Sequence, residues 1–181
     1  RVTQWFHTDC LANYYNVPAW SEEHWRIVEN FARTARRNGI NLLLTPVFTP
    51  ALDTVVGGER TTVQLVDVCK NGNAYSFGFD KLDRWIEMCN RVGIEYFEIA
   101  HLFTQWGAEH APKVMATVDG EYKRIFGWDT DATGEDYPPF LRAMLTAFLA
   151  HMKSRRNGRG DDKRCLFHIS DEPNLAQLEQ Y

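Results

Sequence analysis

The chain has 181 residues, 44% of them apolar and 13% aromatic, and a formal net charge of −4 at pH 7. It has no basic stripe of the kind that nucleic-acid-binding proteins carry, and no apolar run approaches the roughly 18 residues of a membrane-spanning helix, so neither nucleic acid nor a membrane span is expected. The 4 cysteines form no Cys-x-x-Cys pair, so no zinc or redox motif is indicated and free thiols are expected. Unpaired thiols are typical of the cytoplasm, but the compartment stays open.

Four short segments have the pattern of β-strands. They lie at residues 3–7, 40–45, 94–99 and 165–169. The segment 41–45 (NLLLT) contains a continuous apolar run, which is typical of a strand buried on both faces. Strands of this kind are found in parallel sheets, where helices cover both faces.

A helix is predicted after each of the first three strands. Ser21 caps the first helix and Asp80 the second, whereas Pro138 and Pro139 begin the third. Gly93 follows the last periodic residue of the second helix and ends it. The resulting β-α-β-α-β-α-β order predicts an α/β fold in which four parallel strands lie side by side in chain order, with the helices outside.

Two connections are unusually long, and both follow strands. The first, 46–79, holds a predicted hairpin that turns at KNGN (70–73), and the second, 101–137, holds another that turns at residues 119–120. Loops longer than about 15 residues are usually functional in a compact domain. Both leave the C-terminal ends of strands, where α/β barrels and open α/β sheets place their active sites.

Polar and aromatic residues gather where three of the strands end. They are His7 and Asp9 with the first strand, Glu98, His101, Gln105 and Trp106 with the third, and Asp171 and Glu172 after the fourth. Each has a structural alternative: a lone histidine is usually a satisfied structural residue, and an acidic pair before a proline suits a helix N-terminus. Three strands that present such groups on one rim favour a functional site. No glycine-rich turn precedes a helix, so nucleotide phosphate is not expected there.

One interpretation of the rim is a metal-dependent hydrolase. His7, Asp9, Glu98, His101 and Asp171 would then supply nitrogen and oxygen ligands. Zinc sites in barrels favour sets richer in histidine, and the HTD segment offers one imidazole where HxH would offer two. We therefore expect that neither a metal nor another cofactor is needed, and that these residues form hydrogen bonds to a sugar or to the catalytic pair.

Glycoside hydrolysis is the second interpretation. Ordinary retaining glycosidases need two carboxyl groups about 5 Å apart that flank the bond, and adjacent residues such as Asp171 and Glu172 fit that geometry badly. They suit the substrate-assisted exception, in which the 2-acetamido oxygen of the sugar is the nucleophile. One carboxyl group protonates the leaving oxygen, while its neighbour holds the acetamide N–H and stabilises the positive ring that forms.

Four motifs resemble the catalytic domain of glycoside hydrolase family 123 and the related uncharacterised domain family 4091. They are HTDCLA, TPVFTP, EIAHLFTQWGAEHAPK and, most specifically, SDEP, and the resemblance covers nearly the whole chain. It implies hydrolysis of N-acetyl-β-hexosaminides, chiefly N-acetyl-β-galactosaminides, with retention and with assistance from the substrate. Carried over by motif, Glu172 is the general acid/base and Asp171 orients the 2-acetamido group.

The resemblance also implies a fold of the (β/α)8 TIM-barrel type with the Asp-Glu pair at the end of strand four. Only about the first four β/α units are present, with two hairpin insertions, so we expect residues 1–181 to be a single partial domain, the N-terminal half of a catalytic barrel. A half barrel leaves two unpaired edges and an exposed apolar interior, both hazards for association. The segment would therefore associate with itself, adopt an open sheet, or form part of a longer protein.

The expected partner is a glycan that contains N-acetylhexosamine. The expected substrate-binding residues are His7, Asp9, Glu98, His101, Gln105, Trp106 and Trp128. The two tryptophans either bind sugar or pack against the missing half of the barrel. A non-catalytic carbohydrate-binding domain that has kept the rim is the remaining alternative, and the sequence leaves galacto or gluco specificity and exo or endo action open.

Overall fold

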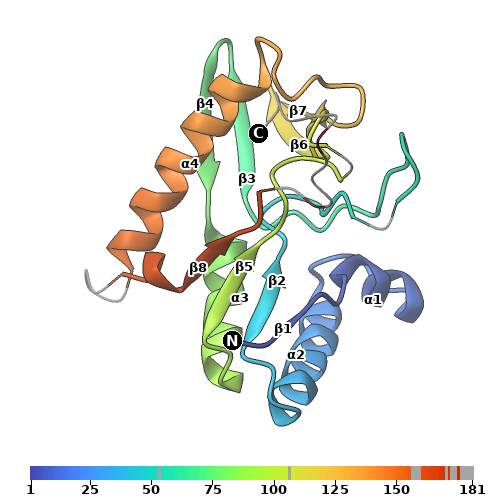
Figure 1. Ribbon diagram of the computed structural model, residues 1–181, viewed down its shortest axis with the longest axis vertical. Coiled ribbons are helices and arrows are strands. Elements are labelled where there is room, and N and C mark those ends of the chain that lie inside the picture. The colour runs from blue at the N-terminus through green and yellow to red at the C-terminus, as the bar shows by residue number, and fades with distance from the viewer. Residues whose placement is uncertain (53, 106, 156–159, 170, 172–174, 176–181) are drawn as a thin grey trace.

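In the computed structural model of the protein, the described residues are 1–52, 54–105, 107–155, 160–169, 171 and 175. The strands are β1 (Thr3–Gln4), β2 (Leu42–Thr45), β3 (Asp67–Asn71), β4 (Ala74–Gly78), β5 (Tyr96–Ile99), β6 (Val114–Val118), β7 (Glu121–Phe126) and β8 (Cys165–Phe167). The helices are α1 (Thr8–Tyr15), α2 (Glu22–Arg37), α3 (Asp80–Val92), α4 (Tyr137–Ser154) and the 3-10 helix η2 (Asp162–Arg164). The strands form two sheets, and the longer helices lie along their outside (Figure 1).

The central sheet has four parallel strands in the order β1-β2-β5-β8. In β2, Leu43 lies opposite Gln4 on one side and Phe97 on the other, and every residue of this strand is buried, as expected from its apolar run. The α/β class and the parallel order of the strands are therefore confirmed. A closed (β/α)8 barrel stays a prediction, since β1 and β8 are the outer strands of this sheet in the described part of the chain.

The first strand is shorter than predicted. β1 ends at Gln4, and His7 is the N-cap residue of helix α1, which the sequence periodicity did not reveal. This helix has 8 residues, and two of its four buried residues, Thr8 and Asp9, are polar, so its apolar pattern is weak. Asp9, which was expected on the first strand, consequently lies on a helix in the connection that follows it.

Helices α2 and α3 pack against each other beside the central sheet. Ser21 caps α2 as predicted, since its hydroxyl accepts the backbone N–H of His24 at 3.2 Å. Asp80 does not cap α3 as predicted: Phe79 is the N-cap residue, because its carbonyl accepts the N–H of Asp83 at 2.8 Å and places Asp80 inside the first turn. A carboxylate there is still favourable, because it interacts with the positive end of the helix dipole.

The two long connections form hairpins, as predicted, and the hairpins join in a second sheet of order β4-β3-β6-β7. The joint is a short parallel pairing of β3 with β6. β3 begins at Asp67, because the N–H groups of Leu65 and Val66 just before it bond to carbonyls of the segment after β2, at 2.9 and 3.3 Å. This sheet lies beyond the C-terminal ends of the central strands (Figure 1).

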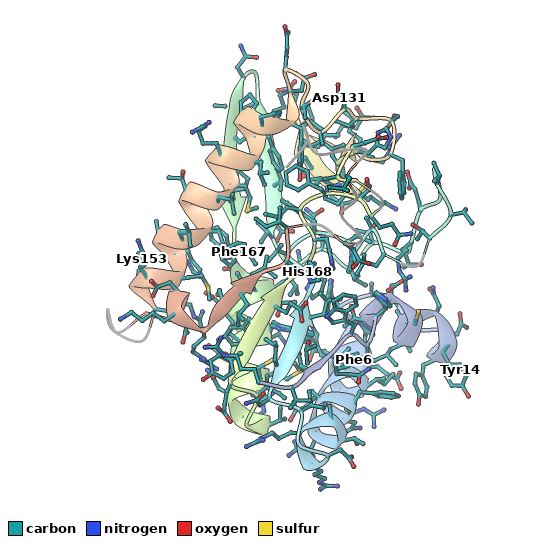
Figure 2. The ribbon with its side chains drawn as sticks, viewed as in Figure 1. Phe6, Tyr14, Asp131, Lys153, Phe167 and His168 are labelled. Carbon is teal, nitrogen blue, oxygen red and sulfur yellow. The ribbon has the colours of Figure 1, made fainter. Side chains whose placement is uncertain are left out.

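Helix α4 packs against both sheets and joins their cores. Its buried Phe140 contacts the rings of Tyr75 and Phe126, with centroids 5.0 and 4.9 Å away, and its Phe148 meets Phe167 of β8 at 6.0 Å. Figure 2 shows that His168, the residue after β8, lies near the middle of the molecule. In the described part of the chain, no helix combines the length and the apolar character needed to cross a membrane.

Candidate active site

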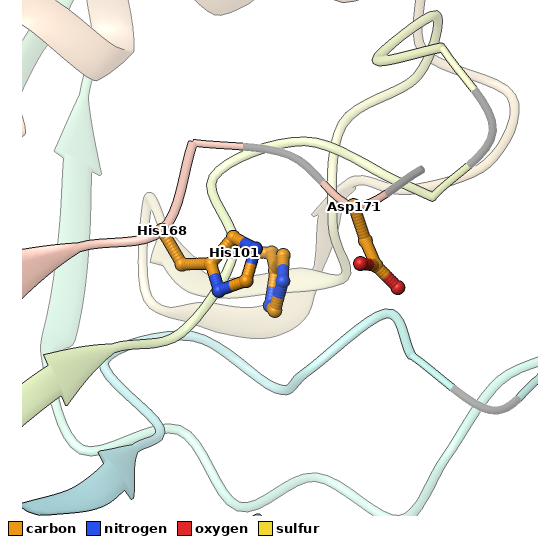
Figure 3. A group of neighbouring side chains, drawn as sticks. All are labelled: His101, His168 and Asp171. Carbon is orange, nitrogen blue, oxygen red and sulfur yellow. The ribbon is translucent and has the colours of Figure 1, made fainter. Parts of the chain in front are cut away.

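The C-terminal ends of β5 and β8 bring two histidines together. Ile99 and Phe167 are opposite each other in the parallel pair, so His101 and His168, which follow them closely in sequence, leave the sheet at the same edge. The centroids of their rings are 3.9 Å apart. Asp171 completes the group, and one potential ligand atom from each of the three residues lies within 4.8 Å of the other two (Figure 3).

Glu98 holds one member of this group, His168, by a hydrogen bond. It lies on β5, where its carboxylate accepts the hydroxyl of Thr3 at 2.5 Å and bonds to Nδ1 of His168 at 2.9 Å. Burial opposes its ionisation, but the hydrogen bonds from His168 and Thr3 outweigh burial and lower the pKa of Glu98 below its ordinary value. Glu98 is therefore a carboxylate at neutral pH. It holds Nδ1 of His168 and leaves Nε2 of that ring for another partner.

His101 is buried and neutral. Burial and the neighbouring His168 lower the pKa of its imidazole to about 4, and the ring of Trp5 lies edge-on at 5.3 Å. Neither ring nitrogen of His101 has a hydrogen-bond partner in the described part of the protein. An unsatisfied buried polar group costs about 1–3 kcal/mol, so this imidazole has two ring nitrogens that a ligand could bond to.

Asp171 is half-buried and its carboxylate points away from the β8 segment, on the side of the histidine pair that faces the chain after β2 (Figure 3). Glu172, the expected acid/base, and Trp106 lie outside the described residues. His7, the N-cap of α1, is close enough to His101 to contribute to the lowering of its pKa.

Three of the other expected substrate-binding residues lie outside this group. Asp9 is buried on α1, and both of its carboxylate oxygens accept bonds from Arg60, at 2.8 and 3.2 Å. Gln105 is buried and donates to the carbonyl of Thr54 at 3.4 Å. Trp128 follows β7 and lines a cavity of about 290 Å³ beside the loop after β2.

His168 was missed by sequence reasoning, although it lies within FHISDEP, three residues before Asp171. Its partner Glu98 is 70 residues away in sequence, so only the pairing of β5 with β8 reveals the contact. The signal that could have found His168 is its place near the C-terminal end of a predicted buried strand. The same criterion selected His101.

The group can do two kinds of chemistry. Two imidazoles and a carboxylate offer neutral and charged hydrogen-bonding atoms to a sugar, and they are also a nitrogen and oxygen set of the kind that divalent transition metals accept. With a metal bound, Glu98 would orient His168 through Nδ1, as carboxylates commonly do for histidine ligands.

Comparison with known proteins identifies the family. The family model described as "Glycoside hydrolase 123, catalytic domain" matches residues 5–181, which include every site residue named above. The resemblance expected from the motifs is thereby confirmed. A comparison with curated proteins gives no match.

Proposed function

Because the chain belongs to the glycoside hydrolase 123 family, we propose that it hydrolyses N-acetyl-β-hexosaminides, with N-acetyl-β-galactosaminides as the preferred substrates. The family makes it a glycosidase whose substrate is a carbohydrate. The observation that carries the finer proposal is the placement of Asp171 beside His101, a buried neutral imidazole without a protein partner in the described residues. A sugar ring held at this point would place polar substituents against both side chains.

The proposed mechanism is retaining and assisted by the substrate. The 2-acetamido oxygen attacks the anomeric carbon as the bond to the leaving oxygen breaks, and Glu172 gives that oxygen its proton. Asp171 accepts the acetamide N–H and stabilises the positive charge of the cyclic intermediate. Glu172 then takes a proton from a water molecule as that water attacks the anomeric carbon. This attack opens the ring that the acetamido group formed and restores the original configuration at the anomeric carbon.

The two histidines are proposed to hold the sugar rather than to transfer protons. A neutral imidazole at His101 can donate from one nitrogen and accept at the other, which suits the hydroxyl groups of a sugar. His168 is fixed by Glu98, so its free nitrogen is held in one orientation before the substrate arrives. Such preorganised groups stabilise the transition state without reorganising during the reaction.

We also propose that the four parallel β/α units are the N-terminal half of a (β/α)8 barrel. The support is the order β1-β2-β5-β8 together with the placement of the site at the C-terminal edge of the strands. The remaining strands would pair with β1 and β8 and cover the open edges, which otherwise favour self-association. A full-length structure in which β1 pairs with a strand outside residues 1–181 would test this.

The decisive experiment is an assay of the full-length protein on aryl N-acetyl-β-galactosaminide, with the gluco epimer and the 2-hydroxy galactoside for comparison. We expect hydrolysis of the N-acetyl substrates, a β product seen first by proton NMR, and almost no turnover of the 2-hydroxy substrate, which brings no nucleophile. Efficient cleavage of the 2-hydroxy substrate, or an α product, would refute the mechanism. Binding of the N-acetyl sugar without turnover would instead identify a carbohydrate-binding domain.

A second candidate is a metal-dependent hydrolase, favoured by the grouping of His101, His168 and Asp171. This set of ligands differs from the one expected from sequence, which included Asp9 and Glu98. In the structure Asp9 is paired with Arg60, and Glu98 with His168. Elemental analysis of the purified protein, and turnover after treatment with a chelator, separate the two candidates. Full activity in metal-free protein supports the substrate-assisted mechanism, and loss that zinc or manganese restores supports the metal-dependent one.

A further inference from the structure

The cavity beside Trp128 is separate from the histidine group and has no role in the mechanism above. One wall is the loop after β2, residues 49–51, 54 and 56–60, and the other is the turn after β7, residues 127–129, with Arg124 beside it. Lys113 lies between them, and the backbone of Thr49 forms a bridge to that of Lys113. The volume of about 290 Å³ is at the lower end of the range for small-molecule sites, so it suits one sugar ring rather than a longer chain.

We propose that this cavity is a subsite for an uncharged sugar residue on the leaving-group side of the bond that is cleaved. The inference rests on the proposed function and extends it to the second residue of the substrate. Every substrate of a glycosidase that acts on oligosaccharides has a residue on that side, whether cleavage is at the end of the glycan or within it.

The charges that line the cavity are already compensated. Its three cations are each paired with a carboxylate: Arg60 with Asp9 at 2.8 Å, Lys113 with Glu59 at 3.0 Å and Arg124 with Asp129 at 2.6 Å. An anionic ligand would have to break one of these pairs, whereas hydroxyl groups can bond to the paired groups without separating them. The balance of charge therefore indicates a neutral sugar rather than a uronic acid or a sulfated one.

Trp128 supplies the apolar surface that a sugar ring needs on one face. It is half-buried, its ring lies 5.8 Å from that of His110, and it lines the cavity next to Gly127. A side chain at Gly127 would meet Nη1 of Arg124 at 2.1 Å, so the glycine leaves room for the guanidinium beside the tryptophan. An aromatic face bordered by fixed polar groups is a common way to bind a ring that is apolar on its faces and polar at its edge.

The loop that forms the cavity is attached to helix α1 and to the segment after β5, which follow the first and third strands of the central sheet. Asp9 holds Arg60 and lies two residues after His7, and Gln105 bonds to the carbonyl of Thr54 and lies four residues after His101. The structure thus assigns Asp9 and Gln105 a positioning role in substrate binding, through the loop rather than by contact with the first sugar. These two attachments tie the cavity loop to segments that carry His7 and His101, which supports a subsite next to the candidate active site.

The test compares two substrates and three variants of the full-length protein. The substrates are N-acetyl-β-galactosaminyl fluoride, whose leaving group is a single atom and does not fill a sugar subsite, and a disaccharide in which the same residue is β-linked to a neutral hexose. Trp128→Ala is expected to lower kcat/KM for the disaccharide about tenfold, with less than a twofold change for the fluoride. Trp128→Phe should keep most of the activity. Tyr122→Ala, an exposed residue of the same hairpin that does not line the cavity, is the matched control and should change neither.

An equal loss for both substrates, or no loss for either, would overturn the subsite. A disaccharide with a uronic acid in the leaving position should be cleaved no better than the neutral one, and a clear preference for it would overturn the assignment of an uncharged sugar. Calorimetric binding of the disaccharide gives a second measurement that does not depend on turnover. If the wild type hydrolyses nothing, the proposed function fails, while weaker binding to Trp128→Ala than to Tyr122→Ala would still establish the subsite, and equal binding would refute it.

Discussion

Replacement of Glu98 by glutamine tests whether its carboxylate holds the candidate active site together. Glutamine keeps the shape and can still bond to His168 and Thr3, so the change removes mainly the charge. A hydrogen bond to a charged group contributes about 1.5–3 kcal/mol and a neutral one about 0.5–1.5 kcal/mol. For the two bonds at 2.9 and 2.5 Å, the free energy of unfolding should therefore fall by about 2 kcal/mol at pH 7. The Glu98 side chain is only 10% exposed, so solvent screens these bonds little.

The dependence on pH makes this prediction specific. The pKa of Glu98 is lowered in the folded protein, from an ordinary value of 4.5. A group of this kind contributes stability that is fully present above its unfolded pKa and is lost as the pH falls through its folded pKa. The difference in free energy of unfolding between wild type and Glu98→Gln should thus be largest near pH 7 and shrink below about pH 4.5.

Urea denaturation of both proteins between pH 7 and pH 3.5 measures this difference. Glu95→Gln is a suitable control, because Glu95 has a side chain that is 51% exposed and its ion pair with Arg36 is long, at 3.6 Å. We expect that control to change the stability by less than about 0.5 kcal/mol. A difference for Glu98→Gln that is absent at pH 7, or that persists unchanged at pH 3.5, would refute the assigned role of the carboxylate.

Three further predictions concern the site itself. Asp171→Asn should lower kcat about 10²–10³-fold with KM little changed, because its contact strengthens only in the transition state, and near-normal turnover would return it to a capping role, which asparagine also fills. Glu172→Gln should lower turnover about 10²–10⁴-fold, and the loss should be smaller for substrates with a good leaving group; an equal loss for good and poor leaving groups would exclude it as the acid. His101 has a folded pKa of about 4 against an ordinary 6.5, so the unfolded state binds the extra proton first and the protein should lose stability as the pH falls from 6.5 to 4. His101→Gln should flatten that slope in the same urea experiment, and an unchanged slope would mean that His101 titrates normally.

Local sequence determined the elements whose signals lie within a few residues. The apolar run of β2, the cap at Ser21 and the turn between β6 and β7 were all predicted, because each depends on neighbours in the chain. The family and its glycosidase chemistry were also accessible, since SDEP and the three other motifs are continuous segments. Helix α1 was missed because two of its four buried residues, Thr8 and Asp9, are polar, which leaves too few apolar positions for a periodic pattern.

Contacts between distant segments were decided by the tertiary structure alone. Glu98 and His168 are separated by 70 residues, and Asp9 and Arg60 by 51, so their pairing depends on which strands are neighbours and where a loop returns. The sequence placed Asp9 on the catalytic rim because it follows a strand. The structure assigns that carboxylate to an arginine instead, since a buried charge must be paired and Arg60 is the cation that the loop after β2 brings to it.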